Sequence, residues 1–258
     1  MASAPGLLAD DEPSAVYALR ESGRSPFFLV CDHAGRRLPR RLGSLGLTDD
    51  ELQRHIAWDI GAAGVVHLMA EALDAVAILQ TYSRLVIDCN RSPHVPSSIV
   101  ELSEHTEVPG NRSLSQTERD ARLNEIFRPY HDRIRLELDR REKDKIPTAL
   151  IAVHSFTPVF KGAGRAWHAG ILYNHDARMA RSMLAHLRRD GDLVVGDNQP
   201  YAITDASDYT IPVHGEHRGL PHVEIEIRQD LIADEAGQRW WSERLVQALV
   251  ATWETMSG

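Results

Sequence analysis

Residues 26–33 read Pro26-Phe27-Phe28-Leu29-Val30-Cys31-Asp32-His33, a continuous apolar run that ends in two polar side chains. Apolar residues at every position, rather than at every second one, are typical of a strand that is buried on both faces. Such strands occur in parallel sheets with helices on both sides. The stretch therefore predicts a central strand of an α/β domain, with Asp32 and His33 at its carboxyl end.

Two further predicted strands end in polar residues in the same way. Residues Thr148–Val153 form a second apolar run that leads into His154, and residues Arg84–Cys89 lead into Asn90-Arg91. Because ligands of open α/β sheets gather at the carboxyl ends of the strands, we expect these side chains to lie near one another. Two histidines from separate strands can meet there, which is the geometry that a three-ligand catalytic zinc site needs.

The rest of the chain alternates predicted strands with predicted helices. Two capping boxes, Thr48-Asp-Asp-Glu51 and Ser115-Gln-Thr-Glu118, mark helix starts, and Pro129 is expected to kink or break the helix that follows the second. This alternation favours a mostly parallel central sheet covered by helices on both faces. The long irregular segment 196–221 is expected near the site, because long loops in compact domains tend to be functional. The other predicted strands are 75–79, 170–173, 193–196 and 222–228, and the predicted helices cover 58–75, 115–145, 176–189 and 235–256.

The composition is that of an ordinary globular protein, with 43% hydrophobic and 26% charged residues among 258. The net charge of −8 disfavours binding to nucleic acid or to an anionic membrane, so we expect neither as a partner. No apolar run reaches the ~20 residues of a membrane span. The 13 histidines direct attention to metal ligands.

No repeat or linker divides the chain, so we expect residues 1–14 to form a flexible arm and residues 15–258 to form a single catalytic domain. The first residues lack the features of a signal peptide. The two cysteines do not make a disulfide framework. A cytoplasmic location is therefore expected.

Five motifs follow one another along the chain: Cys31-Asp-His33-Ala-Gly35, His55-Ile-Ala-Trp-Asp59-Ile-Gly61, Tyr82-Ser-Arg84-Leu-Val-Ile-Asp-Cys-Asn90-Arg91, Val153-His154-Ser-Phe156 and Pro221-His-Val-Glu-Ile-Glu226-Ile-Arg228. Together, from about Phe27 to Ile232, they resemble the N-formylglutamate amidohydrolase family. The resemblance implies a three-layer α/β/α, carboxypeptidase-like fold with a mostly parallel central sheet and one zinc ion per chain. It also implies hydrolysis of the amide of an N-formyl or other N-acyl amino acid. The expected substrate is a small-molecule carboxylate like N-formyl-L-glutamate, and the expected products are formate and the free amino acid.

The resemblance implies that His33, Asp59 and His154 bind the zinc ion. In carboxypeptidase-like enzymes the first ligand pair is His-x-x-Glu, but the third residue after His33 is Arg36, which cannot bind a cation. Asp59, at the start of the next predicted helix, is assigned the displaced carboxylate role. Asp32 is the competing third ligand, and an ordinary helix N-cap is the alternative role for Asp59.

Glu224, Glu226 and Arg228 alternate along the predicted strand 222–228 and therefore share one face. Three charged residues on one face usually mark a solvated edge, but here the other face is entirely apolar. Glu226-Ile-Arg228 resembles the Glu-Leu-Arg of carboxypeptidases, in which the glutamate is the general base. Glu226 is therefore the expected base that takes a proton from the attacking water, and Glu224 is the alternative.

The resemblance assigns three further residues to the reaction and the substrate. Arg84 is expected to stabilise the tetrahedral oxyanion, and Asn90 with Arg91 to bind the substrate carboxylate, a task that suits a guanidinium fork. Surface ion pairs are the alternative for both arginines. The Arg36–Arg41 cluster either binds a second anionic group or faces solvent. Residues in candidate site loops without an assigned role are His55, Arg165, His168, Tyr201 and His217.

Three other functions compete with this one. A related deacylase or carboxypeptidase-like hydrolase would act on another carboxylate substrate. A catalytically silent ligand-binding protein on the same scaffold would bind no zinc, so the metal content of the purified protein separates it from the enzyme. A cysteine hydrolase would use Cys31 or Cys89 and would lose its activity on thiol alkylation, although buried free thiols are usually structural.

Overall fold

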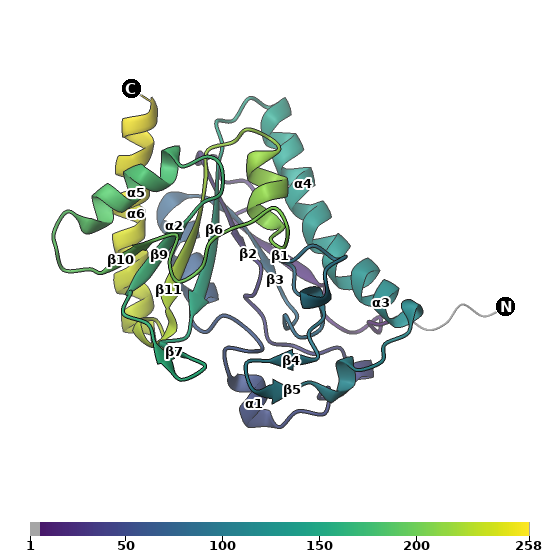
Figure 1. Cartoon of the computed structure of the whole chain (residues 1–258). Helices are drawn as coiled ribbons and strands as arrows, with labels where there is room; N and C mark the ends of the chain where they lie inside the picture. The colour runs from purple at the N-terminus through teal and green to yellow at the C-terminus, as the bar shows by residue number, and fades with distance from the viewer. Residues whose placement is uncertain (1–5, 258) are drawn as a thin grey trace.

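The computed structural model describes residues 6–257, and at its centre is a seven-stranded sheet (Figure 1). The strands of this sheet are β1 (Val16–Leu19), β2 (Phe27–Cys31), β3 (Val76–Gln80), β6 (Ala149–Phe156), β9 (Ala169–Leu172), β10 (Val195–Asp197) and β11 (His222–Arg228). Their order across the sheet is β1-β3-β2-β6-β11-β9-β10. The four central strands β3, β2, β6 and β11 are parallel, and β10 is parallel to β9. Only the pairs β1–β3 and β11–β9 of this sheet are antiparallel.

Helices cover both faces of the sheet. The helices of the described residues are α1 (Asp49–Gln53), α2 (Ala62–Leu73), α3 (Gln116–Arg122), α4 (Arg128–Lys143), α5 (Arg178–Arg188) and α6 (Glu235–Ser257), of which α1 lies beyond the ends of the strands. Figure 1 shows α5 and α6 on one side of the sheet and α4 on the other, and α2 packs against α6. The three-layer α/β/α fold with a mostly parallel sheet, predicted from the sequence, is confirmed.

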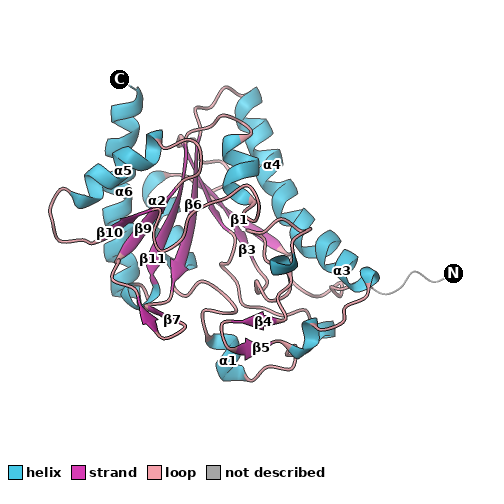
Figure 2. Cartoon of the chain, in the orientation of Figure 1, coloured by secondary structure: helices cyan, strands magenta, loops and turns pink. Residues whose placement is uncertain are grey.

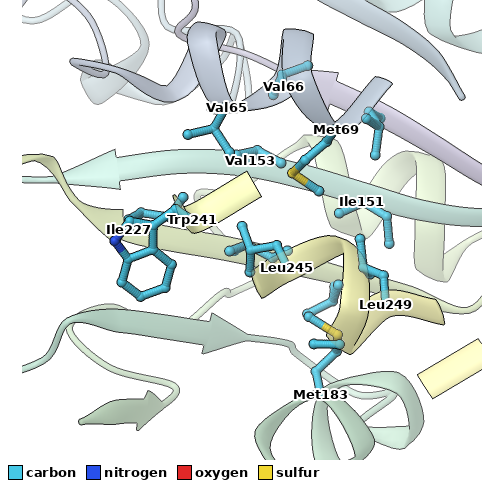
Figure 3. Packing of buried hydrophobic residues seen from close by; sticks show 14 of the residues in the cluster. Val65, Val66, Met69, Ile151, Val153, Met183, Ile227, Trp241, Leu245 and Leu249 are labelled. Atoms are coloured by element: carbon cyan, nitrogen blue, oxygen red, sulfur yellow. The ribbon is translucent and has the colours of Figure 1, made fainter. Parts of the chain in front are cut away.

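Alternate residues of the central strands pack into two separate cores. On one face, Ile151 of β6 packs with Met69 of α2 and Leu245 of α6 (Figure 3). On the other face, Leu150 belongs to the core that contains Ile134 of α4. Because both faces are covered, apolar residues occupy successive positions of these strands, and this is the pattern that predicted them.

Both predicted capping boxes are present. The side chains of Thr48 and Ser115 each accept a hydrogen bond from the backbone N–H three residues later, and they begin α1 and α3. The long helix predicted after Ser115 is interrupted by a π-helical stretch, Leu123–Phe127, and α4 then continues to Lys143. Pro129 therefore lies in the first turn of α4, where its missing N–H is tolerated.

Two strand predictions need correction. Residues 84–89 form turns rather than a strand, and the apolar side chains of Leu85 and Val86 are buried in two different cores. An apolar run shows that a segment is buried but does not show that it pairs in a sheet, which is why the prediction was wrong. The second correction concerns β6, which extends to Phe156, so that His154 lies within the strand and not after it.

Loops and two small hairpins lie beyond the carboxyl ends of the central strands (Figure 2). The hairpins are β4 (Leu102–Ser103) with β5 (Thr106–Glu107), and β7 (Val159–Phe160) with β8 (Ala163–Gly164). Segment 196–221, predicted as an irregular loop, contains the π-helical stretch Ile211–Glu216. Short 3-10 turns lie at Arg40–Leu42, Pro96–Ser98, Pro109–Asn111 and Gln229–Leu231.

Residues 6–14 pack against the rest of the chain. The backbone N–H groups of Leu7 and Leu8 donate to the Glu125 carboxylate at 2.7 and 2.8 Å, and the side chain of Leu7 is buried. The flexible arm expected over residues 1–14 is therefore not free over its described part, while residues 1–5 lie outside the described residues. The single catalytic domain over 15–258 stays a prediction. Within residues 6–257, no helix has the length and apolarity that crossing a membrane requires.

Candidate active site

The structure brings His33, Asp59 and His154 together at the carboxyl end of the central strands. His33 follows β2, His154 lies on the neighbouring β6, and Asp59 lies in the turn that precedes α2. Oδ2 of Asp59 is 2.8 Å from Nδ1 of His154 and 3.3 Å from Nδ1 of His33. All three side chains are buried.

The second nitrogen of each imidazole contacts another carboxylate. Nε2 of His33 is 2.7 Å from Oδ1 of Asp88, and Nε2 of His154 is 3.0 Å from Oδ2 of Asp32. Burial opposes the charge on Asp32, but the hydrogen bond and the charge of His154 outweigh it and lower the pKa of Asp32 to about 2. Because an ionised carboxylate only accepts, each Nε2 donates to its own carboxylate, and each Nδ1 donates to Asp59 when no metal ion is bound. A metal ion bound beside Asp59 would replace the two Nδ1 protons and bind to the nitrogen lone pairs.

Two imidazole Nδ1 atoms and one carboxylate thus converge on one point, and this donor set fits a zinc ion. Carboxylates behind histidines are the usual means of orienting the nitrogen that binds a metal. Ligands bonded to zinc at about 2.0–2.1 Å in a tetrahedron lie about 3.3–3.4 Å apart. The 2.8 and 3.3 Å between Asp59 and the two Nδ1 atoms are near this spacing. Three protein ligands would leave the fourth position open, as catalytic zinc sites do.

The backbone places Asp59, rather than Asp32, between the two histidines. The N–H of Asp59 donates to the carbonyl oxygen of His33 at 3.0 Å, which ties the turn to the end of β2. The N-cap of α2 is Gly61, with φ of +81°, so Asp59 is not the helix cap. Asp32 instead contacts the far side of His154 and accepts a hydrogen bond from a threonine hydroxyl.

Arg84 binds two carboxylates at this site. Its Nε and Nη2 donate to Oδ2 of Asp88 at 3.1 and 2.5 Å, and its Nη1 donates to Oδ1 of Asp59 at 3.4 Å. Burial opposes the charge on Asp88, but Arg84 and His33 outweigh burial and hold the pKa of Asp88 well below its usual value. Arg84, whose side chain is 28% exposed, therefore pairs with two buried carboxylates rather than with surface ones. Its role toward the oxyanion stays a prediction.

Glu224 and Glu226 are buried and lie two positions apart on β11, so their face of the strand is not a solvated edge. Oε2 of Glu224 accepts a hydrogen bond from Nδ2 of Asn90 at 3.1 Å. Oε2 of Glu226 has no hydrogen-bond partner among the described residues, and Glu226 lies opposite His154 in the β6–β11 register. Burial raises the pKa of Glu226 to about 8. Of the two glutamates, Glu226 therefore has the freer carboxyl group.

Asn90 and Arg91 have different surroundings. Oδ1 of Asn90 accepts the N–H of Thr210 at 3.1 Å while its Nδ2 binds Glu224, so both ends of this amide are anchored inside the protein. Nη1 of Arg91 binds the Asp208 carboxylate and the carbonyl oxygen of Asn90. Among the described residues, Nε and Nη2 of Arg91 have no hydrogen-bond partner, and the side chain is 30% exposed. Nε and Nη2 of Arg91 can therefore bind an anionic ligand.

Most of these groups, although not Asp32 or Asp59, line one cavity of about 390 Å³. Phe160 of β7 and Tyr201 form part of its wall, and the guanidinium of Arg165 lies 4.8 and 4.6 Å from their ring centres. The charged and histidine side chains in the lining are His33, His55, Arg84, Asp88, Arg91, Glu104, His154, Asp208, Glu224 and Glu226.

Comparison with known proteins agrees with the resemblance found in the motifs. The sequence model of the N-formylglutamate amidohydrolase family matches residues 25–233. The chain belongs to this family. The match contains every proposed metal ligand, base and substrate-binding residue of the site.

Solved structures also resemble this member of the N-formylglutamate amidohydrolase family. A gene product of Agrobacterium tumefaciens is 36% identical, with a TM-score of 0.95 over 98% of this chain and 100% of that one. An N-formylglutamate amidohydrolase from Ralstonia eutropha is 15% identical, with a TM-score of 0.69 over 95% of this chain and 100% of that one, and it shares the fold. No curated protein matches the chain.

In this family member, two site residues were missed in the sequence. Asp88 is the one acidic residue in the apolar run Leu85-Val-Ile-Asp-Cys89. An acid within a buried apolar run needs a charged or hydrogen-bonding partner, and this requirement is the signal that could have identified Asp88 as a site residue. Asp208, which binds Arg91, lies in the irregular segment 196–221, where no pattern distinguishes it from solvent-exposed acids.

The Arg36–Arg41 cluster does not line the cavity. Arg36 stacks on Trp58 at 5.3 Å, Arg40 pairs with Asp11, and Arg41 donates to a backbone carbonyl. These arginines bind protein groups, so the second-anion alternative gains no support. Of the residues without an assigned role, His55 and Tyr201 line the cavity, whereas His168 and His217 line other depressions.

Neither cysteine lies in the cavity lining. Cys31 and Cys89 are both buried, and burial raises the pKa of both thiols. A thiol that stays protonated is a poor nucleophile. The cysteine hydrolase alternative therefore has no support in the structure.

Proposed function

We propose that the chain is a zinc-dependent amidohydrolase that hydrolyses the N-formyl amide of an amino acid such as N-formyl-L-glutamate, releasing formate and the free amino acid. The observation that carries the proposal is the convergence of Nδ1 of His33, Nδ1 of His154 and the Asp59 carboxylate. The two histidines line a cavity that Glu226 and Arg91 also line. One zinc ion per chain would be held by His33, Asp59 and His154.

Glu226 is the proposed general base. A zinc ion held by His33, Asp59 and His154 would polarise the amide carbonyl and would make water nucleophilic near neutral pH. Glu226 would accept a proton from the attacking water, because its Oε2 has no other partner among the described residues. The positive charge of a bound zinc ion would lower the pKa of Glu226 and so keep it ionised for this step. The same carboxyl group then donates that proton to the departing nitrogen as the C–N bond breaks. Glu224, which Asn90 holds at 3.1 Å, positions this end of the site.

Arg91 is the proposed binding group for the substrate carboxylate. Its partner Asp208 fixes one nitrogen and leaves the others for a ligand. Arg84 has no comparable freedom, since both carboxylates that it contacts are buried and keep it beside Asp59, where it can stabilise negative charge on the reacting carbonyl oxygen.

A second substrate class is favoured by the charges in the cavity lining. Five carboxylates, from Asp88, Glu104, Asp208, Glu224 and Glu226, face only two arginines there. A substrate with two carboxylates would find a second cation in this lining only at Arg84, which is already paired. An N-formyl or N-acyl amino acid with one carboxylate and a neutral side chain is therefore the second candidate.

The test is formate release from N-formyl-L-glutamate and N-formyl-L-glutamine by the purified chain. We expect chelation to remove zinc and activity together, and added zinc to restore both. Glu226→Gln should keep its zinc and lose about 10²–10⁴ in kcat. Glu224→Gln is the matched control with a smaller loss. If Glu226→Gln keeps its full rate with both substrates, the assignment of the base is wrong.

A further inference from the structure

Thr210 is fully buried and contacts two different parts of the active site. It immediately precedes the π-helical stretch Ile211–Glu216, but its side chain does not cap that stretch. Its hydroxyl donates instead to Oδ1 of Asp32 at 2.7 Å, and its backbone N–H donates to Oδ1 of Asn90 at 3.1 Å. The hydroxyl thus joins the irregular segment 196–221 to the residue that follows β2, 178 positions earlier in the chain.

The buried carboxylate of Asp32 has one hydrogen bond on each oxygen. Oδ1 accepts the Thr210 hydroxyl, and Oδ2 accepts Nε2 of His154 at 3.0 Å. Within residues 6–257 this side chain has no third hydrogen bond, and the nearby hydroxyl of Tyr130 has no hydrogen-bond partner. Apart from His154 itself, Thr210 is therefore the one group that holds Asp32 in place through a hydrogen bond to its carboxylate.

The hydrogen bond from Thr210 sets the direction in which Asp32 presents its other oxygen. The torsion about the Cβ–Cγ bond of an aspartate is broad, so the hydrogen bond to His154 does not by itself fix the plane of the carboxylate. A hydrogen bond on the second oxygen fixes this plane, and with it the line along which Nε2 of His154 points. Because the imidazole ring is rigid, this line also determines where Nδ1 lies, which is 2.8 Å from Oδ2 of Asp59.

The carboxylate behind the other histidine, His33, is held by more donors. Oδ1 of Asp88 accepts the backbone N–H of Asn90 at 2.9 Å, and its Oδ2 accepts two nitrogens of the Arg84 guanidinium. Hydrogen bonds from a charged group are stronger than those from a neutral hydroxyl. The orientation of His154 therefore depends on one neutral side chain, whereas that of His33 depends on a guanidinium and a backbone group.

The same segment holds the substrate side of the site through other groups. Asn90, which accepts the N–H of Thr210, donates to Glu224 at 3.1 Å, and Asp208 binds Arg91. These contacts use the backbone of residue 210 and the side chain of a different residue. A substitution that changes only the Thr210 hydroxyl therefore breaks the contact with Asp32 and leaves Asn90 and Arg91 with their partners.

We propose that Thr210 is a positioning residue whose hydroxyl, through Asp32, orients His154 toward the metal ion. The inference rests on the proposed function in one respect, which is that His154 is a metal ligand. Loss of a group that orients a metal ligand typically weakens metal binding by about 10–100-fold. We therefore expect Thr210→Val, which keeps the shape of threonine without its hydroxyl, to bind zinc more weakly by about this factor. Thr210→Ser keeps the hydroxyl and should bind zinc nearly as tightly as wild type.

Competition with a chromophoric chelator measures the zinc affinity of the full chain, with Zn²⁺ as the probe and no substrate present. Thr252→Val is the matched control, because it removes a buried threonine hydroxyl of α6 that has no hydrogen-bond partner among the described residues. It should keep the wild-type affinity. Thr210→Ala also removes the hydroxyl and repeats the comparison if Thr210→Val does not fold. Zinc-saturated Thr210→Val should lower kcat for an N-formyl amino acid and keep KM, because Arg91 retains its partner Asp208.

Equal zinc affinities in wild type and Thr210→Val would overturn the inference, as would a loss that Thr210→Ser shares. A rise in KM together with the fall in kcat would also overturn it, since the hydroxyl would then hold the whole segment rather than His154. The zinc affinities do not require hydrolysis. If wild type binds zinc but releases no formate, the proposed function is wrong, while a weaker affinity of Thr210→Val still supports the role of Thr210.

Discussion

Arg91 differs from Arg84 in having nitrogens free for a ligand, and this sets its expected effect on catalysis. If Arg91 binds the substrate carboxylate in both the ground state and the transition state, its loss raises KM more than it lowers kcat. We expect Arg91→Ala to weaken substrate binding by about 1.5–3 kcal/mol, roughly ten- to a hundredfold. Arg91→Lys should recover only part of this, because an ammonium lacks the planar fork. Steady-state kinetics with N-formyl amino acids measure both constants.

The control for Arg91 changes the substrate. Replacing the substrate carboxylate by an amide should weaken substrate binding to the wild type by a similar factor. The same replacement should weaken binding to Arg91→Ala by little more. Additive losses would show that the guanidinium and the carboxylate do not meet.

The sequence was sufficient to predict the position of a site residue where a family motif lay at the end of a predicted strand. His33 and His154 follow or lie in apolar strands, so their convergence could be expected, and Asp59 was favoured over Asp32 through the family resemblance. The carboxylates behind the histidines could not be assigned, because a hydrogen bond between Asp88 and His33 joins residues 55 positions apart in the chain. Asp208 has the same difficulty, since its partner lies in another loop.

The C-terminal helix α6 is held by one apolar face. Its buried residues Trp241, Leu245 and Leu249 recur at helical spacing and pack against α2 and α5 (Figure 3). We expect Leu245→Ala to lower the free energy of unfolding by about 2–5 kcal/mol, because it leaves a cavity in this core. Val250→Ala removes a side chain that is 39% exposed on the same helix and should change stability by less than about 0.5 kcal/mol. Urea denaturation of both variants measures the difference, and equal losses would contradict the packing.

Helices and strands could be predicted where the pattern of apolar residues in the sequence matched both the burial and the hydrogen-bond pairing of the segment. The helix predicted over 235–256 and the strand predicted over 222–228 agree closely with α6 and β11, since periodicity alone identifies them. Residues 84–89 have the composition of a strand, but their neighbours in space are loops. That difference depends on tertiary contacts, which a local pattern does not contain.

A buried histidine pair joins distant parts of the molecule and makes its stability depend on pH. Nδ1 of His131, on α4, is 3.0 Å from Nε2 of His214, and Nε2 of His131 is 2.8 Å from the carbonyl oxygen of Cys89. Burial lowers the pKa of His131 to about 4, and burial with the nearby His131 lowers that of His214 to about 3. Both pKa values lie below the usual value of about 6.5 in an unfolded chain.

The unfolded chain therefore binds more protons than the folded chain between about pH 6.5 and pH 4. The free energy of unfolding should fall as the pH falls through this window, by up to about 1.4 kcal/mol per pH unit for each histidine. Urea denaturation at several pH values measures this slope. His214→Gln, whose amide can still donate to His131, should reduce the slope, and His94→Ala should leave it unchanged. A wild-type slope that persists in His214→Gln would show that other groups cause it.

Alternate side chains of β11 have different tasks: those on one face pack in the core and those on the other face line the cavity. On β11, Val223, Ile225 and Ile227 face the core of α2, α5 and α6, while Glu224 and Glu226 face the cavity. Substitutions on the core side and on the cavity side have few partners in common, so their effects should combine nearly independently. A lineage could thus exchange one substrate for another through the even-numbered positions while the odd-numbered positions preserve the scaffold. The pleat of a single strand therefore lets the cavity change while the fold stays the same.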